Sequence, residues 1–183
     1  MKKEQILNTT LALIAKKGIS GSPMSLIAKE SGIAIGTIYH HYKSKDEIIN
    51  ALYLKKKEDF QTLLSEFLPS DLTIEQKFTG IWKSFYFYFV NNPLNFRFSQ
   101  QIGSSPIITP ETKAEGQTYY AAIFDFYQEG IDRGIFVDMD TIIMGQLQFS
   151  NIMSMVELAI EGADITEEKL QEAMAYSWRA ILK

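Results

Sequence analysis

The chain contains no cysteine among its 183 residues. Structural disulfides and thiolate metal sites are therefore excluded. No apolar run approaches the roughly 18 residues that a membrane-spanning helix needs, so no membrane partner is expected. Residues 1–3 are basic, as in a signal peptide, but polar side chains between Glu4 and Thr10 interrupt the apolar stretch that such a peptide requires. These absences predict a cytoplasmic protein.

Histidine is also scarce, and the two copies, His40 and His41, are neighbours. Adjacent helical residues diverge by roughly 100°, so this pair would chelate a metal poorly, and no third ligand is evident. The chain has no D-D-x-x-D run and no histidine elsewhere that could complete a catalytic set. We therefore expect no metal, no cofactor and no enzymatic activity.

The net charge of −4 conceals a division along the chain. Residues 1–57 hold ten lysines and four acidic residues, a surplus of six positive charges. Residues 58–183 hold eight basic and eighteen acidic residues, a surplus of ten negative charges. A basic N-terminal third attached to an acidic body is typical of a protein that reads nucleic acid with its N-terminal part, although a chance cluster of solvated lysines is the alternative.

Apolar residues recur at helical spacing over most of the chain, without strand alternation or internal repeats. The predicted fold class is therefore all-α. Gly18, Pro69-Ser70-Asp71 and the loop 103–110 carry the clearest break signals. Helices are expected at residues 3–17, 23–31, 33–42, about 45–67, 73–91, 94–102, 111–133, 140–161 and 166–182.

Residues 22–52 form the most informative segment. Ser22 is a suitable N-cap, Pro23 suits a first helical position, and Gly32 stands where a turn needs a positive φ. In the short helix that follows, Ile38 and Tyr42 are four residues apart and can face inward. The outward face then mixes small, hydroxyl and aromatic residues beside two lysines, which is natural for a helix lying against DNA. These outward residues are Gly36, Thr37, Tyr39, His40, Lys43 and Lys45.

The segment resembles the DNA-binding domain of the TetR family of bacterial transcriptional regulators. The matching residues are I-A-K-E-S-G at 27–32, G-T-I-Y-H-H-Y at 36–42 and S-K-D-E-I-I at 44–49. The resemblance covers about the first 55 residues. It implies a three-helix helix-turn-helix domain at 1–47, a linking helix at about 45–67, and a larger helical effector-binding and dimerisation domain at 48–183.

The resemblance also implies which residues meet DNA. The recognition helix would enter the major groove, with phosphates held from flanking positions. Ile35 departs from the family, which often has lysine or a small polar residue there. This removes one expected phosphate contact, or replaces it with an apolar contact such as one to a thymine methyl. The alternative is that Tyr39 and His40 pack between helices. The candidate DNA-binding set is Ser25, Ile35, Gly36, Thr37, Tyr39, His40, Lys43 and Lys45.

A small-molecule effector pocket is a second implication of the resemblance, and the aromatic residues of the body suggest a large, apolar site. Ordinary core packing is the alternative for any one of them. The acidic body favours a neutral or cationic ligand. The candidate lining residues are Trp82, Phe85, Tyr86, Phe89, Phe96, Tyr120, Phe124, Tyr127, Phe149 and Met153.

The last two predicted helices look like the pair that forms a four-helix dimer interface in the family. A homodimer also suits a two-fold DNA site, because one short helix buries little surface. These faces could alternatively close the core of the protomer. The candidate interface residues are Met144, Leu147, Gln148, Asn151, Met155, Leu158, Leu170, Met174 and Trp178.

Together these observations predict a homodimeric, sequence-specific repressor. It would bind a near-palindromic double-stranded operator and leave it when a small, largely apolar or aromatic ligand binds. A transcriptional activator, or a regulator controlled by a partner protein, would use the same N-terminal domain. A helical enzyme or an adaptor bundle without a DNA role is disfavoured by the missing catalytic set, the 36–42 segment and the charge division.

Overall fold

The structure, a computed structural model, describes residues 1–68, 71–103 and 105–183. These residues form ten helices and no named strand, which confirms the all-α fold class. Pro69 and Ser70 of the predicted break and Ser104 of the predicted loop lie outside the described residues. The helices are α1 Lys2–Lys17, α2 Met24–Ser31, α3 Ile35–His41, α4 Lys45–Ser65, α5 Ile74–Asn91, α6 Pro93–Ile102, α7 Pro110–Thr118, α8 Ala121–Asp132, α9 Thr141–Ile160 and α10 Glu167–Arg179.

The chain packs into two compact units. The first holds residues 1–58 and 93–118, and the second holds residues 59–92 and 119–183. Helices α6 and α7 therefore pack with the N-terminal helices, although the expected boundary at residue 47 assigns their sequence to the C-terminal domain. No helix among the described residues is long and apolar enough to cross a membrane.

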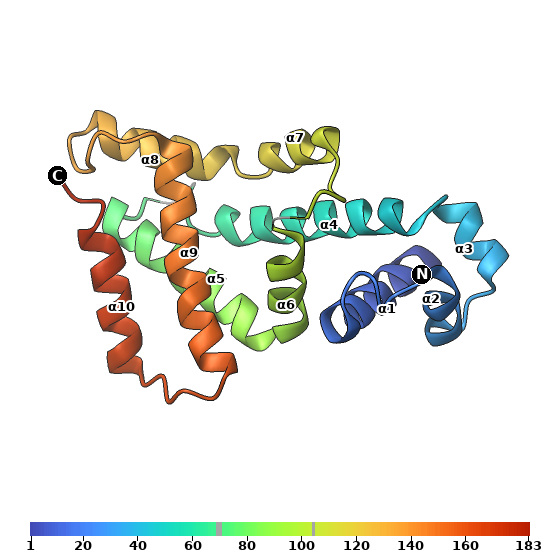
Figure 1. Ribbon diagram of the computed structural model, residues 1–183. Coiled ribbons are helices and arrows are strands. Elements are labelled where there is room, and N and C mark those ends of the chain that lie inside the picture. The colour runs from blue at the N-terminus through green and yellow to red at the C-terminus, as the bar shows by residue number, and fades with distance from the viewer. Residues whose placement is uncertain (69–70, 104) are drawn as a thin grey trace. The chain divides into compact units, whose positions relative to one another are not determined.

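The first unit contains two apolar clusters. One joins α1, α2, α3 and the start of α4, and includes Ile6, Ile27 and Ile38. The other joins α1, α4 and α6, and Figure 1 shows α6 beside α1. Polar contacts reinforce this second junction, because the Gln101 side chain donates to the carbonyl of Ile14 at 2.9 Å.

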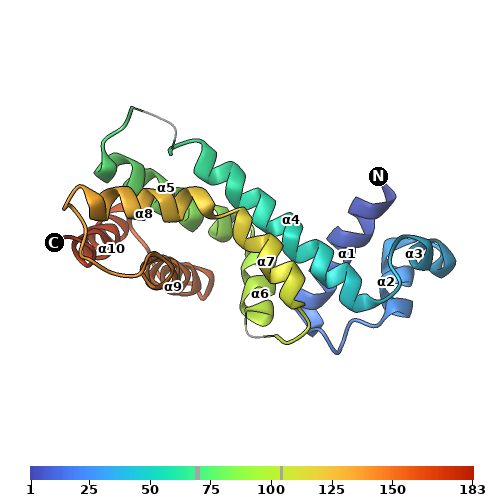
Figure 2. The same cartoon turned by 90° about the horizontal axis from the view of Figure 1, so that it is seen from above.

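The segment before α7 is fixed to α4 by one side chain. The Asn50 amide nitrogen donates to the carbonyl of Ile107 at 2.9 Å, and its oxygen accepts from the Thr109 N–H at 3.0 Å. Farther along, Gly116 lies against the Tyr53 ring, where a Cβ would come within 2.7 Å. In both ribbon views α7 runs alongside the first part of α4 (Figures 1 and 2).

The second unit is built around α5 and α9, with α8 packed on α9 and α10 packed on both α5 and α9. A capping box begins α5, since Thr73 accepts from the N–H of Gln76 and the Gln76 side chain accepts from the N–H of Thr73. The side chain of Asp140 similarly caps α9. The buried face of α5 is strongly aromatic and includes Phe78, Trp82, Phe85 and Phe89.

The prediction of one long helix at 111–133 was wrong. The structure has α7 and α8 separated at Tyr119 and Tyr120, where Tyr120 takes φ −108° and ψ 0° and precedes α8. The chain passes from the first packing unit to the second between Thr118 and Tyr119. The apolar residues behind the prediction lie in α8 and just before it, whereas α7 is polar and Gly116 is its buried residue, so the apolar pattern carries no signal for this break.

Three other local predictions can be compared with the structure. Ser22 is not an N-cap, because α2 begins after Pro23 and the Ser22 hydroxyl donates to the carbonyl of Gly18 at 2.8 Å. Ser44 does cap α4, accepting from the N–H of Glu47 at 3.2 Å. The last helix ends at Arg179 rather than 182, since the N–H groups of Val137 and Lys183 bond the carbonyls of Ile181 and Ile135.

Candidate nucleic-acid interface and ligand cavity

The helix-turn-helix is formed by α2 and α3. Gly32 ends α2 with φ +66°, a left-handed conformation that favours glycine. Ile38 on α3 is completely buried and Tyr42, just after it, is 7% exposed. These two side chains fix the inward face of α3 and so determine which residues point outward.

The outward face of α3 carries most of the predicted contact residues. Tyr39 is 50% exposed and Ile35 is 43% exposed, both high values for large apolar side chains. Gly36 and His40 are exposed beside them, and Thr37 is half-buried. Tyr39 and His40 therefore do not pack between helices, as the alternative interpretation required, and this face is open to a partner.

Gly36 is not required by packing within the chain. No heavy atom lies within 4 Å of the position that a Cβ would take, and the residue is helical. Glycine within a helix costs roughly 0.5–1 kcal/mol relative to alanine. Packing within the first unit therefore gives no reason for a glycine at this exposed position.

The two flanking lysines differ. Lys43 is exposed, whereas Lys45 is half-buried and its ammonium donates to the carbonyl of Ile19 at 2.7 Å. Lys45 thus contacts the chain between α1 and α2, and its remaining N–H groups are available for a phosphate. Ser25 is exposed in the first turn of α2.

The His40 and His41 rings lie 5.4 Å apart, centroid to centroid. Within the part of the chain that the structure describes, no group of three or more His, Cys, Asp or Glu residues is placed to hold a metal ion.

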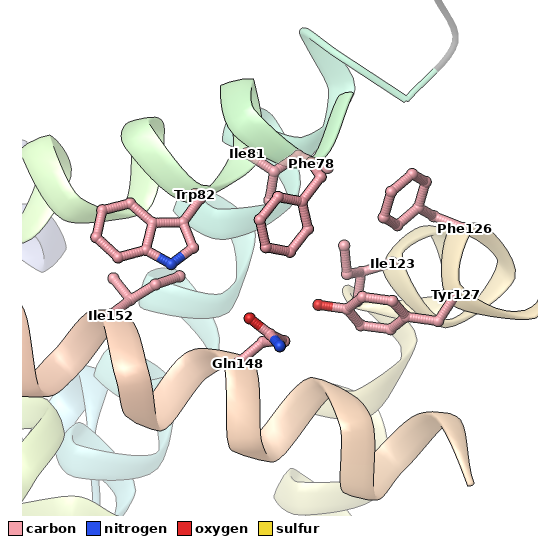
Figure 3. A pocket seen from close by; sticks show the side chains of 8 residues that line it. All are labelled: Phe78, Ile81, Trp82, Ile123, Phe126, Tyr127, Gln148 and Ile152. Atoms are coloured by element: carbon pink, nitrogen blue, oxygen red, sulfur yellow. The ribbon is translucent and has the colours of Figure 1, made fainter. Parts of the chain in front are cut away.

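The second unit has a small, partly open cavity of about 20 Å³ between α5, α8 and α9 (Figure 3). This volume is close to that of one water-sized group. None of the lining residues is charged, and Ile123 alone among them is partly exposed. The lining residues are Phe78, Ile81, Trp82, Ile123, Phe126, Tyr127, Gln148 and Ile152.

Trp82 and Tyr127 are the two predicted pocket residues that line this cavity. The other six were missed because the prediction selected aromatic residues instead of following one helical face. Phe78 lies one turn before Trp82, and Ile81 lies three residues after Phe78, so helical steps from Trp82 to Phe78 and from Phe78 to Ile81 would have found both.

At most of the other predicted pocket positions the aromatic side chains pack against one another. The Phe60 ring lies 5.2 to 6.3 Å, centroid to centroid, from four predicted lining residues. These residues are Phe85, Phe89, Tyr120 and Phe149. Their mostly tilted and edge-on geometry is that of close-packed aromatics.

The remaining predicted pocket residues also lie outside the cavity lining. Tyr86 stacks on Trp82 at 5.9 Å, and Phe124 and Met153 are half-buried. Phe96 is buried on α6, which belongs to the first packing unit, so it does not line the cavity of the second.

Two buried polar atoms at the cavity have no hydrogen-bond partner among the described residues, Trp82 Nε1 and Gln148 Oε1. Gln148 Nε2 donates to the carbonyl of Ser177 at 3.0 Å. Burial also raises the pKa of the Tyr127 phenol, so this group is neutral at pH 7. A buried polar group without a partner costs roughly 1–3 kcal/mol, so this pair calls for an explanation.

Fewer of the predicted dimer-interface residues are exposed on the protomer than the sequence analysis expected. Met144, Gln148, Leu170 and Met174 are buried inside the protomer and are corrected to core residues. Trp178 is half-buried, with its ring 5.1 Å from Phe78 and 5.7 Å from Phe136.

Exposed apolar side chains nevertheless follow α9. Leu147 and Leu158 of the predicted set are 53% and 47% exposed, and Asn151 and Met155 are half-buried. Ile142, Ile143 and, on α10, Tyr176 are exposed as well and were not predicted. These three exposed residues could not be identified from the sequence, because that requires knowing which face of each helix packs inside the protomer.

The fold is all-α, Gly32 makes a left-handed turn between α2 and α3, and α3 exposes a face of small, hydroxyl and aromatic residues. This arrangement is that of a helix-turn-helix DNA-binding protein. The family follows from comparison with known proteins. Residues 6–52 match the model of bacterial regulatory proteins of the tetR family, and residues 73–182 match the tetracyclin repressor-like C-terminal domain. The chain belongs to the TetR family of helix-turn-helix transcriptional regulators.

Individual relatives agree with this assignment. An uncharacterised helix-turn-helix transcriptional regulator of Haemophilus influenzae is 24% identical over 98% of this chain and 95% of its own length. A TetR-family regulator from Shewanella has a crystal structure that superimposes with a TM-score of 0.92 at 22% identity, covering 100% and 99% of the two chains. The Bacillus subtilis regulator FadR, crystallised with stearoyl-CoA, has a TM-score of 0.77 at 20% identity and covers 98% and 97%.

Proposed function

We propose that this regulator is a homodimeric repressor that binds a near-palindromic operator through two copies of α3. The outward face of α3 carries the proposal, above all Gly36, whose missing side chain serves no packing within the chain. Tyr39, His40, Thr37 and Ile35 would read base edges or contact the backbone. The residues Ser25, Lys43 and Lys45 would hold phosphates.

The homodimer brings two such faces to successive major grooves. Ile143, Leu147 and Leu158 of α9 are large apolar side chains exposed on the protomer, and they support an interface there because partner binding would remove them from water. Two-fold symmetry would then match the symmetry of the operator.

The effector is a small, largely apolar or aromatic molecule that enters the α5–α8–α9 region and releases the operator. The uncharged, aromatic lining of the cavity supports this class of ligand. The complex of the similarly folded FadR with stearoyl-CoA is a precedent for an apolar ligand in this fold. The regulator would work in the cytoplasm by binding alone, without catalysis, metal or cofactor.

Ligand release requires a difference in affinity between two conformations. To move the protein from about 99% bound to about 1% bound, the ligand must favour the released conformation by roughly 5.5 kcal/mol. The small volume of the cavity means that the helices or aromatic side chains around it must move when a ligand enters. That movement would supply the required difference in ligand affinity between the bound and the released conformation.

Fluorescence anisotropy with the DNA upstream of the protein's own gene tests the proposal. The expected result is nanomolar, salt-sensitive binding that a scrambled duplex of equal length does not compete for. Equal, weak binding to several candidate fragments and to the scrambled duplex would contradict sequence-specific regulation. Transcription from the same fragment in vitro should fall on adding the protein; a rise would identify an activator.

A further inference from the structure

The two unpartnered atoms at the cavity are complementary in kind. Trp82 Nε1 can only donate a hydrogen bond, and Gln148 Oε1 can only accept one. The orientation of the Gln148 amide is fixed, because Nε2 donates to the carbonyl of Ser177 and a carbonyl accepts only from N–H or O–H. Trp82 is 1% exposed and Gln148 is 4% exposed, so neither atom is solvated from the surface.

Figure 3 shows both groups directed into the same space, Trp82 from α5 and Gln148 from α9, with the Tyr127 hydroxyl directed toward them from α8. The surrounding walls are Phe78, Ile81 and Ile152 with other apolar side chains. The cavity is thus apolar except for one donor, one acceptor and a hydroxyl that can act as either.

The chemistry of a matching group follows from these atoms. A carboxylate could accept from Trp82 but would be repelled by Gln148 Oε1, and no charged residue lines the cavity to compensate it. A ketone or ether would satisfy Trp82 and leave Gln148 unpaired. An amide could satisfy both atoms only with two separate groups, its C=O and its N–H, whereas a hydroxyl does so with a single oxygen and needs the least room beside them.

We propose that this cavity is a hydroxyl-recognition site: a neutral hydroxyl accepts from Trp82 Nε1–H and donates to Gln148 Oε1. Water supplies the hydroxyl in the free protein, and an alcohol or phenol group of the effector supplies it in the complex. The apolar remainder of the effector enters past Ile123, the lining residue that is partly exposed. The inference rests on the proposed effector site and specifies which chemical group that site selects.

Nuclear magnetic resonance of the two tryptophan indoles tests the proposal on the full-length protein, because each indole N–H gives its own signal. The matched probes are 4-propylphenol, its methyl ether 4-propylanisole, which accepts but cannot donate, and propylbenzene, which does neither. We expect 4-propylphenol to move the Trp82 signal more than that of Trp178. It should bind at least about tenfold more tightly than either other probe.

In the free protein, a cross-peak between Trp82 Hε1 and water should be present and should disappear as 4-propylphenol binds. Trp178→Phe assigns the signals and is the matched control, because it removes an indole that does not line the cavity and should leave the affinity unchanged. Trp82→Phe and Gln148→Met should each reduce the preference for the phenol over the ether to less than about threefold.

Equal affinity for the three probes, an unmoved Trp82 signal, or failure of 4-propylphenol to bind would each overturn the proposal. These titrations use the wild-type chain, so they decide the matter even if a cavity variant does not fold. Operator binding needs no ligand and is measured separately. Loss of the hydroxyl preference with intact operator binding would therefore reject this inference and leave the proposed regulator standing.

Discussion

The outward face of α3 and the cavity beside α5 place their residues in opposite environments. On α3 the candidate contact residues face solvent, and the inward residues Ile38 and Tyr42 hold the helix. At the cavity the candidate residues are themselves part of the core, so the proposed ligand recognition would depend on the same side chains as stability. Substitutions should therefore separate binding from stability on α3 and should couple them around α5.

The largest effect is expected from Phe60→Ala. Phe60 is 3% exposed and lies at the centre of the aromatic cluster, so its removal should lower the free energy of unfolding by about 3–5 kcal/mol. Denaturant unfolding measures this change. The matched control is Phe87→Ala, at a position 43% exposed, which should cost under about 1 kcal/mol. Similar costs for the two variants would mean that the cluster is hollow rather than packed.

Tyr39→Ala should separate operator binding from the stability of the fold most clearly. A good base contact is worth roughly 1–3 kcal/mol, and the proposed dimer would lose it twice, so operator affinity should fall at least about 30-fold. The Tm and the dimer should be unchanged, because Tyr39 is half exposed and α3 is held by other side chains. Anisotropy and thermal unfolding are the two measurements. Unaltered operator affinity in this variant would remove Tyr39 from the interface.

Gly36→Ala should change stability and binding in opposite directions. The open space at the Cβ position allows the substitution to stabilise the fold by up to about 0.5–1 kcal/mol. The added methyl group should at the same time weaken operator binding about tenfold if DNA approaches this backbone closely. Gly36→Ser makes a second test of the same space. Tight operator binding by both variants would show that the groove does not contact Gly36.

A pH-dependent effect on stability is expected from Lys57. Burial lowers the pKa of its ammonium to about 8, from 10.5 in the unfolded chain. Below pH 8 both states hold the proton. Between pH 8 and 10.5 the unfolded chain holds more protons, so stability should rise with pH in this window. Lys57→Met should be more stable near neutrality and should flatten the rise. Unfolding curves at pH 7.5 and 9.5 measure the difference, and an identical slope in both proteins would contradict the assignment.

Much of the fold and of the α3 face could be predicted from the sequence. The spacing of Ile38 and Tyr42 determines the inward side, and Ser44 marks the start of α4, so the exposed residues follow by helical geometry. These sequence signals are local, because each one involves residues no more than about four positions apart.

The cavity could not be predicted in the same way. Trp82, Phe85 and Phe89 are all aromatic and all on the buried side of α5, yet of these three only Trp82 lines the cavity. The difference depends on Gln148 and Tyr127, which approach from α9 and α8. Likewise, the break at Tyr119 and Tyr120 is caused by a change of packing partner, which a local apolar pattern does not record.

The position of α6 in the first packing unit has a consequence for biosynthesis. Leu11, Ile14 and Leu52 bury their side chains against Phe98 and Ile102, which are synthesised only after the whole of residues 59–92. At roughly 5–20 residues per second, the ribosome needs a few seconds for that intervening stretch. During this time the first four helices lack part of their core, so a nascent chain must complete its N-terminal unit with a segment from its own middle.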